Sequence, residues 1–315
     1  MEETHMAEIL LSLLMLSLGF LMLVKGSDWF VDGACGIASR FGIPQLVIGL
    51  TIVAMGTSAP EAAVSITAAI KGSADITIGN IVGSNILNIL IILGISSVIT
   101  PLAVSRSTIF YEIPFLIAVT VLLFFQGRNQ TVGFLEGVVL LLVFVVYFVY
   151  LFFMAKKGHG ANGAPAKANS LWRSVLGTAA GLVIIVAGSN MAVDSASTLA
   201  RIFGMSERFI GLTIVALGTS LPELFTSVAA ARKGNADIAI GNIVGSNIFN
   251  ILFVIGISAL IIPIPFSADF YADTLTAAAA GVLLLICCGR SRKLGRISGI
   301  LMLLGYLCYF VFICL

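Results

Sequence analysis

Two stretches of the sequence are near copies of each other, and together they decide the fold. Residues Ile48–Leu102 read IGLTIVAMGTSAPEAAVSITAAIKGSADITIGNIVGSNILNILIILGISSVITPL, and residues Ile210–Ile264 read IGLTIVALGTSLPELFTSVAAARKGNADIAIGNIVGSNIFNILFVIGISALIIPI. A shift of 162 positions aligns them without a gap, and 37 of the 55 aligned positions are identical. A repeat of so long a period indicates a duplicated half-protein and not a solenoid unit. Each copy carries one glutamate, Glu61 or Glu223, inside an apolar run.

The composition of the chain is that of an integral membrane protein. Of its 315 residues, 59% are hydrophobic and only 10% are charged, and the mean hydropathy is +1.11. Soluble domains carry about 25% charged residues, and a bilayer span needs roughly 20 mostly apolar residues. Ten such spans are predicted, centred near residues 16, 56, 88, 117, 143, 184, 218, 250, 279 and 306. We therefore expect an all-α integral membrane protein whose surroundings are a lipid bilayer and which has no nucleic-acid partner.

The predicted spans fall into two halves of opposite orientation. Five spans precede the polar segment around residues 156–173 and five follow it. Because each half has an odd number of spans, the halves cross the membrane in opposite senses and are related by a pseudo-two-fold axis in the membrane plane. Such inverted repeats are characteristic of secondary transporters, whose sites lie at the repeat interface near the midplane. The expected division is a first five-helix repeat at 1–155, a cytoplasmic linker at 156–173 and a second, inverted repeat at 174–315.

The basic residues predict the orientation in the membrane, because Lys and Arg mark cytoplasmic loops. If the N-terminus is outside, 13 of the 17 basic residues fall on the side of the linker. The other side then holds only four: Lys71, Arg128, Arg201 and Arg208. We expect a multi-pass protein of the inner (plasma) membrane with both termini outside and the central loop in the cytoplasm.

A proline and a glutamate interrupt the apolar run of each copy. Pro60 cannot donate to the carbonyl of Gly56, so the helix is expected to open there, and Pro222 repeats the feature. Transporters use carbonyls freed in this way to coordinate cations, although Ser or Thr side chains satisfy such a kink equally well. A carboxylate inside a membrane is costly and is a functional hypothesis by default. No Lys, Arg or His lies in the apolar part of either copy, so Glu61 and Glu223 must take up a proton or meet a mobile cation.

Oxygen-bearing side chains accompany the two glutamates. Where the chain is helical, the glutamates share a face with hydroxyls three and four residues earlier: Thr57, Ser58, Thr219 and Ser220. The next span of each copy adds a hydroxyl and an amide four residues apart: Ser84 with Asn88, and Ser246 with Asn250. The other asparagines there are expected to hydrogen-bond between helices: Asn80, Asn85, Asn242 and Asn247. A set made only of oxygen atoms predicts Ca²⁺ or Na⁺ rather than Zn²⁺ or Cu⁺.

The repeat also includes an earlier acidic motif. The sequence GSDWFVDGA, which begins at Gly26, matches GSNMAVDSA, which begins at Gly188 and is again 162 positions away. Its acidic positions and their counterparts are Asp28 with Asn190, and Asp32 with Asp194. Because the motif lies near the predicted end of a span, we expect partly solvated carboxylates there rather than ion ligands.

The doubled motifs GTSAPE/GTSLPE and GNIVGSN resemble the α-repeats of the cation/Ca²⁺ exchanger superfamily, and the likeness to prokaryotic Na⁺/Ca²⁺ exchangers covers essentially the whole chain. The resemblance implies a secondary antiporter, not an enzyme, which exchanges Na⁺ for Ca²⁺ by alternating access and needs no cofactor. It implies that Glu61 and Glu223 bind Ca²⁺. It further implies that the carbonyls of Thr57 and Thr219 share this Ca²⁺, that the side chains of Ser58, Ser84, Ser220 and Ser246 with the carbonyls of Ala54 and Ala216 line Na⁺ sites, and that Asn88 and Asn250 complete the middle. The first and sixth spans (Ile9–Lys25 and Leu176–Ser189) would slide to switch access.

Other functions are weighed against this one. Proton-coupled Ca²⁺ exchangers share the glutamates, so H⁺ is an alternative coupling ion. Some relatives, K⁺-dependent exchangers among them, have Asp at the position of Asn250, and the asparagine here argues against K⁺ dependence. An intramembrane phosphatase would need Arg or Lys beside the site to hold its substrate. A passive cation channel would pass ions without a counter-ion. A monomer is expected.

Overall fold

The computed structural model of the chain describes residues 2–72, 74–157, 170–205, 214, 216–289 and 291–314. Within this part, eight helices are long and apolar enough to cross a membrane, and a bent pair of helices forms a ninth span. The predicted span centred near residue 218 falls partly on residues outside the described ranges. The all-α membrane fold is therefore confirmed, and the count of ten spans stays a prediction.

The first half of the chain begins with one long helix and continues with a broken one. Its elements are α1 (Glu2–Phe41), α2 (Gln45–Ile48), η1 (Gly49–Val53), α3 (Ala54–Thr57), α4 (Ala59–Ile70), α5 (Asp75–Leu87), η2 (Asn88–Leu93), α6 (Gly94–Ile99), β1 (Leu102–Ala103), η3 (Thr108–Glu112), α7 (Ile113–Gln126), η4 (Gly127–Asn129), β2 (Thr131–Val132) and α8 (Phe134–Lys157). The segments η1, η2 and η3 are π-helical turns, and η4 is a 3₁₀ turn.

The second half repeats this order where it is described. Its elements are α9 (Leu171–Ile202), α11 (Ala216–Thr219), α12 (Leu221–Arg232), α13 (Ala236–Phe249), η6 (Asn250–Ile255), α14 (Gly256–Ile261), β3 (Ile264–Pro265), α15 (Asp269–Gly289), β4 (Lys293–Leu294) and α16 (Arg296–Cys314). The π-helical turn η6 begins 162 residues after η2, so the repeat extends to the irregular turns. Most of the predicted linker lies outside the described residues, between the end of α8 and the start of α9.

The first span is longer than the sequence pattern suggested. The predicted end at Lys25 is wrong, because α1 continues through the acidic motif to Phe41. The helix ends where Gly42 takes a φ of +63° and the N–H of Ile43 donates to the carbonyl of Ala38 at 2.9 Å. Glycine is favoured in this left-handed position because it has no Cβ. The acidic motif is therefore part of a helix and not of a loop.

The two most buried spans form the centre of the molecule. In the span of α5, η2 and α6, 78% of the most apolar window is buried, and in the span of α13, η6 and α14 the share is 83%. The spans of α8 and α16 lie at the periphery, with 17% and 11% buried. Hydrophobic helices that expose most of their surface are suited to contact lipid.

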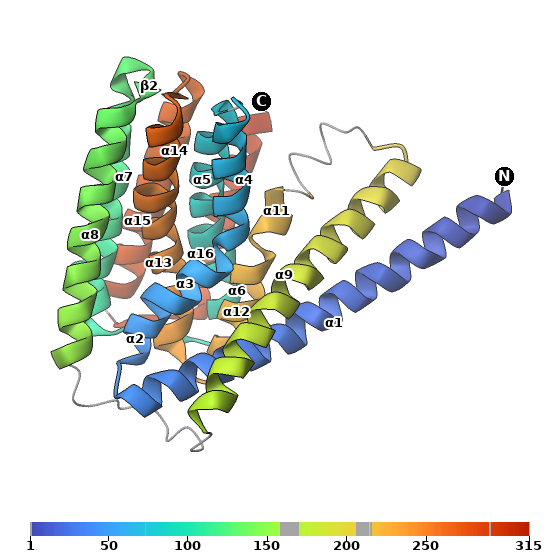
Figure 1. The fold of residues 1–315 in the computed structure, drawn as a ribbon, viewed down its shortest axis with the longest axis horizontal. Helices are drawn as coiled ribbons and strands as arrows, with labels where there is room; N and C mark the ends of the chain where they lie inside the picture. The colour runs from blue at the N-terminus through green and yellow to red at the C-terminus, as the bar shows by residue number, and fades with distance from the viewer. Residues whose placement is uncertain are drawn as a thin grey trace.

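The helices α1 and α9 form a unit of their own beside this bundle. They lie side by side along most of their length and run obliquely to the upright helices (Figure 1). Their backbones approach closely at small residues: a Cβ placed on Gly181 would lie 2.5 Å from the nitrogen of Phe30 and 2.8 Å from the carbonyl oxygen of Gly26. Such small-residue contacts are the usual means of tight helix packing in membranes.

Two short antiparallel strand pairs connect the halves. Leu102 of β1 lies opposite Leu294 of β4, and Val132 of β2 lies opposite Ile264 of β3. A shift of 162 residues turns β1 into β3 and β2 into β4, so each pair is the image of the other. This exchange is the signature of a pseudo-two-fold relation between the halves, as the odd number of spans in each half predicts.

Candidate cation site

Each half breaks a helix just before its buried glutamate. The helix of α2, η1 and α3 bends by 50° into α4, and the break falls at Ser58, where φ is −82° and ψ is 6°. Ser220 has nearly the same conformation between α11 and α12, with φ −92° and ψ 3°. The predicted opening of the helix at Pro60 is confirmed. Glu61 and Glu223 therefore lie in the first turns of α4 and α12, where the positive end of the helix dipole favours a carboxylate.

The two broken helices hold each other's glutamates. The hydroxyl of Ser58 donates to Glu223 Oε1 at 2.7 Å, and the hydroxyl of Ser220 donates to Glu61 Oε1 at 3.3 Å. Both carboxylates are 0% exposed. These reciprocal bonds bring the two glutamates together at the interface of the halves.

Neither glutamate has a protein counter-ion in the described part of the chain. Glu61 Oε2 and Glu223 Oε2 are buried and have no hydrogen-bond partner. The ion pairs that the structure gives all belong to Lys233, which does not contact either residue. Buried charges are ordinarily paired or bound to metal ions, so two unpaired carboxylates in one interior are an exception that requires a function.

Two asparagines bring further free oxygen atoms to the interface. Asn88 and Asn250 begin the π-helical turns η2 and η6, which are rare and frequent at functional sites. Asn88 Nδ2 donates to Asn247 Oδ1 at 2.9 Å, and Asn250 Nδ2 donates to Asn85 Oδ1 at 3.2 Å. Asn88 Oδ1 and Asn250 Oδ1 are buried and have no partner. The site thus holds four free acceptor atoms, two from each half.

The asparagines that orient Asn88 and Asn250 also join the two halves. Asn85 Nδ2 donates to the carbonyl of Asn247 at 3.2 Å, and Asn247 Nδ2 donates to the carbonyl of Asn85 at 3.0 Å. The expectation that these residues hydrogen-bond between helices is confirmed. Since each also accepts from the Nδ2 of Asn250 or Asn88, they fix which end of those amides is left free.

The other predicted ligands lie around the same breaks. Ser246 Oγ donates to the carbonyl of Ala54 at 3.3 Å, and Thr57 Oγ1 donates to Asn242 Oδ1 at 3.0 Å. The remaining predicted residues occupy the equivalent positions: Ser84 on α5 is 5% exposed, Ala216 begins α11 and Thr219 ends it. The structure therefore gathers both copies of the motif at one interface.

A pair of serines escaped the sequence analysis. Asn80 Nδ2 donates to Ser65 Oγ at 2.9 Å, and Asn242 Nδ2 donates to Ser227 Oγ at 2.9 Å. The same amide groups reach the carbonyls of the glutamates at 3.4 Å. Each serine follows its glutamate by four residues and is identical in both copies, so the repeat itself contained the signal. The bonds attach the glutamate helix of each half to the next span.

Comparison with known proteins identifies the family. Residues 11–153 and 173–315 match the family model described as sodium/calcium exchanger protein. The chain belongs to this family. The two matched segments correspond to the two halves of the fold, and the family is one of ion exchangers and not of enzymes.

Relatives of this exchanger-family chain match it over nearly its whole length. It is 39% identical over 305 residues to the putative antiporter CaxA of Alkalimonas amylolytica, which covers 92% of this chain and 95% of that protein. It is 33% identical to the sodium/calcium exchanger MaX1 of Methanosarcina acetivorans, with 96% and 98% covered. The solved structure of the sodium-calcium exchanger NCX_Mj, soaked with 10 mM Na⁺ and zero Ca²⁺, matches with a TM-score of 0.84 and 32% identity, over 96% of this chain and 99% of that one.

Proposed function

We propose that this protein is a secondary antiporter that exchanges Na⁺ for Ca²⁺ across the membrane by alternating access. The observation that carries the proposal is the set of four buried acceptor atoms without partners: Glu61 Oε2, Glu223 Oε2, Asn88 Oδ1 and Asn250 Oδ1. They come in symmetric pairs from the two halves, and two of them belong to carboxylates. An exchanger needs such atoms because its cargo must replace hydration water with protein oxygen.

The charge and the chemistry of the site suit these two ions. Two carboxylates balance one divalent cation, and Ca²⁺ accepts six to eight oxygen ligands in flexible arrangements. In the proposed site Glu61 and Glu223 bind Ca²⁺ with the carbonyls of Thr57 and Thr219. Na⁺ uses the hydroxyls of Ser58, Ser84, Ser220 and Ser246, the carbonyls of Ala54 and Ala216, and the amide oxygens of the central asparagines. Because Ser58 and Ser220 hold the glutamates, Na⁺ and Ca²⁺ compete for connected groups and one displaces the other.

We propose the arrangement in the membrane from the distribution of charge. The excess of basic residues on the linker side puts the central loop in the cytoplasm and both termini outside. The similarity to inner membrane protein YrbG of Escherichia coli, 35% identical over 95% of this chain, supports the inner membrane as the location. Repeats at 1–155 and 174–315 surround a linker at 156–173. A single chain supplies both glutamates, so a monomer suffices and no cofactor takes part.

A flux assay in vesicles separates the proposed coupling from its alternatives. Purified protein is reconstituted, the vesicles are loaded with Na⁺, and they are diluted into Na⁺-free buffer that contains radioactive Ca²⁺. We expect the outward Na⁺ gradient to drive Ca²⁺ uptake, with no requirement for K⁺. Uptake driven by a pH gradient and not by Na⁺ would establish H⁺/Ca²⁺ exchange, and uptake without any counter-ion gradient would indicate a channel.

The matched variants test the site rather than the fold. We expect Glu61→Gln and Glu223→Gln to abolish the Na⁺-driven uptake. Glu112→Gln serves as the control, because Glu112 is 1% exposed, one of its oxygens accepts from Tyr150, and the other has no partner. Full uptake by either site variant would refute the assignment of the glutamates.

A further inference from the structure

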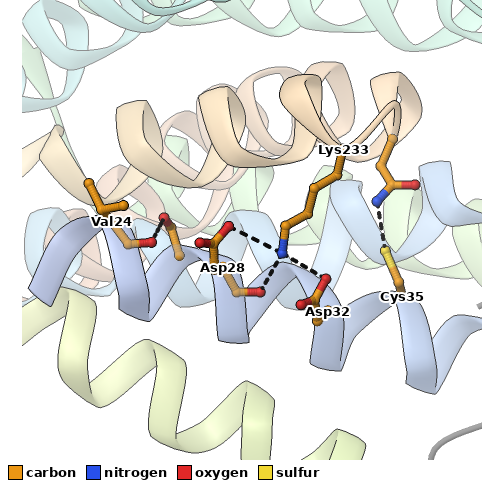
Figure 2. A network of polar contacts seen from close by, with 7 residues as sticks. Val24, Asp28, Asp32, Cys35 and Lys233 are labelled. Atoms are coloured by element: carbon orange, nitrogen blue, oxygen red, sulfur yellow. Dashed lines mark hydrogen bonds and ion pairs between the residues drawn. The ribbon is translucent and has the colours of Figure 1, made fainter. Parts of the chain in front are cut away.

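An ion-pair cluster between α1 and α12 lies outside the cation site. Lys233 Nζ lies 2.7 Å from Asp32 Oδ1 and 3.2 Å from Asp28 Oδ1, and it donates to the carbonyl of Asp28 at 2.9 Å (Figure 2). The amide of Asn235 adds a contact of 3.1 Å with Cys35 Sγ. The two aspartates were expected to be solvated; their side chains are 39% and 63% exposed, but both bind this lysine. The end of α12 is thereby tied to the second half of α1.

The equivalent residues of the other half make no such contact. Lys71 follows α4 as Lys233 follows α12, and both have φ −83° and ψ 0°. The glycines that follow them are also alike, with φ +79° and +78°. Yet Lys71 and Asp194, the counterpart of Asp32, are both exposed, and within the described chain no ion pair joins them. The local structure is symmetric, and the tertiary contact is not.

The same asymmetry extends along the two glutamate helices. Thr226 on α12 is 0% exposed, whereas its counterpart Val64 on α4 is 44% exposed. Ala229 is 9% exposed, whereas its counterpart Thr67 is exposed. The difference arises because α1 packs along α12, while α9 makes no comparable packing against α4. The α1–α9 unit therefore covers one of two nearly equivalent faces of the bundle.

We propose that Lys233, Asp28 and Asp32 form a latch that holds the α1–α9 unit against α12 in one access state, and that Lys71 and Asp194 form the equivalent latch in the opposite state. The proposal rests on the exchange function and its alternating access. In the opposite state α9 packs against α4, and α1 leaves α12. The α1–α12 interface is suited to release, because it contains a cavity of about 290 Å³ beside the latch, lined among others by Val24 and Phe225.

The two latches differ by one charge. Lys233 meets two carboxylates, whereas Lys71 would meet Asp194 and the neutral amide of Asn190, the counterpart of Asp28. The state of this structure is therefore the one that its latch favours. Partly exposed ion pairs change an equilibrium by up to about fivefold, so the latch biases the exchange between states without blocking it.

The experiment measures the opposite state by cross-linking. Lys71→Cys and Asp194→Cys are introduced into the full chain with its five native cysteines changed to Ser. A protease site inserted between α8 and α9 separates the halves on a gel unless a short bifunctional thiol reagent joins them. Lys71→Cys with Asn190→Cys is a second pair, one helical turn away, for the case that the first pair fails to fold. Because no ion gradient is used, the readout is independent of the Na⁺/Ca²⁺ assignment, which the flux assay tests.

The latch residues are then changed in the background of this cysteine pair. We expect Lys233→Met to raise the cross-linking rate about fivefold, Asp28→Asn to raise it about twofold, and Lys233→Arg to restore the original rate. Arg232→Met is the matched control, because it removes the neighbouring positive charge, which makes no ion pair with Asp28 or Asp32. An unchanged rate in Lys233→Met would overturn the proposal. So would the absence of cross-linking in both cysteine pairs while the protein still transports Ca²⁺.

Discussion

Replacing Glu223 by glutamine tests the central physical argument, because it removes a charge and little else. Glutamine has the volume of glutamate, and its amide oxygen can still accept from Ser58, which donates to Glu223 Oε1 at 2.7 Å. The position is 0% exposed, so solvent does not replace the lost charge. The variant should therefore keep the fold and lose Ca²⁺.

The structure and Coulomb's law give the size of the effect. A divalent ion about 2.4 Å from one carboxylate oxygen gains about 14 kcal/mol at an effective dielectric constant of about 20. Dehydration of the ion offsets most of this gain. If a quarter of it survives, the loss is about 3.5 kcal/mol, and Ca²⁺ binding weakens about 300-fold.

The assay is the Ca²⁺-dependent rise in melting temperature of the purified protein in detergent. Ca²⁺ that binds only the folded state stabilises it by an amount set by the ratio of its concentration to the Kd. The midpoint of the Ca²⁺ titration should shift about 300-fold in Glu223→Gln, by the Coulomb estimate above, and by a similar factor in Glu61→Gln because the halves are symmetric. Glu112→Gln should keep the original midpoint.

A second measurement on the same variant guards against misfolding. Without Ca²⁺ and at low Na⁺, Glu223→Gln should melt no lower than the unmodified protein, because it removes one of two buried, unpaired negative charges. A Ca²⁺ midpoint within threefold of the original would contradict the site. A large loss of stability without ions would show that Glu223 holds the fold rather than the cargo.

Two further predictions concern packing and the asparagine bonds. Gly181→Ala should separate α9 from α1 and lower the melting temperature, since its Cβ would lie 2.5 Å from a backbone nitrogen; Gly177→Ala, whose Cβ would meet nothing nearer than 3.5 Å, should not, and equal melting temperatures would refute the close packing. Asn85→Ala should lower the free energy of unfolding by about 2 kcal/mol or more, because it leaves the buried Nδ2 of Asn250 without an acceptor. Denaturant unfolding measures this, with the exposed Asn129→Ala as control, and a loss below about 0.5 kcal/mol would contradict it.

Much of the site was predictable because the chain contains it twice. Two glutamates, each after a proline in an apolar run, identify the helix breaks, and the break at Ser58 is where the proline predicts it. The repeat also predicts which hydroxyls and amides accompany them. The pattern failed at Lys25, where apolar residues give way to polar ones, because α1 buries its polar motif against α9 and α12 instead of ending.

Pairing between the halves could not be predicted in the same way. Sequence spacing puts Ser58 on the face of Glu61, but in the structure it donates to Glu223, 165 residues away. Spacing along a helix describes neighbours on one helix, whereas this contact depends on how two broken helices cross. The orientation of Asn88 by Asn247 has the same origin.

The sequence alone determined the membrane environment, the duplication and the presence of two carboxylates without a basic partner nearby, because composition and repeat identity are properties of the chain itself. Only the tertiary structure decided that the carboxylates meet, and that Lys233 is paired while Lys71 is not. The physical reason is that near-identical halves have near-identical local preferences. The packing of α1 and α9 against one face of the bundle makes equivalent residues differ.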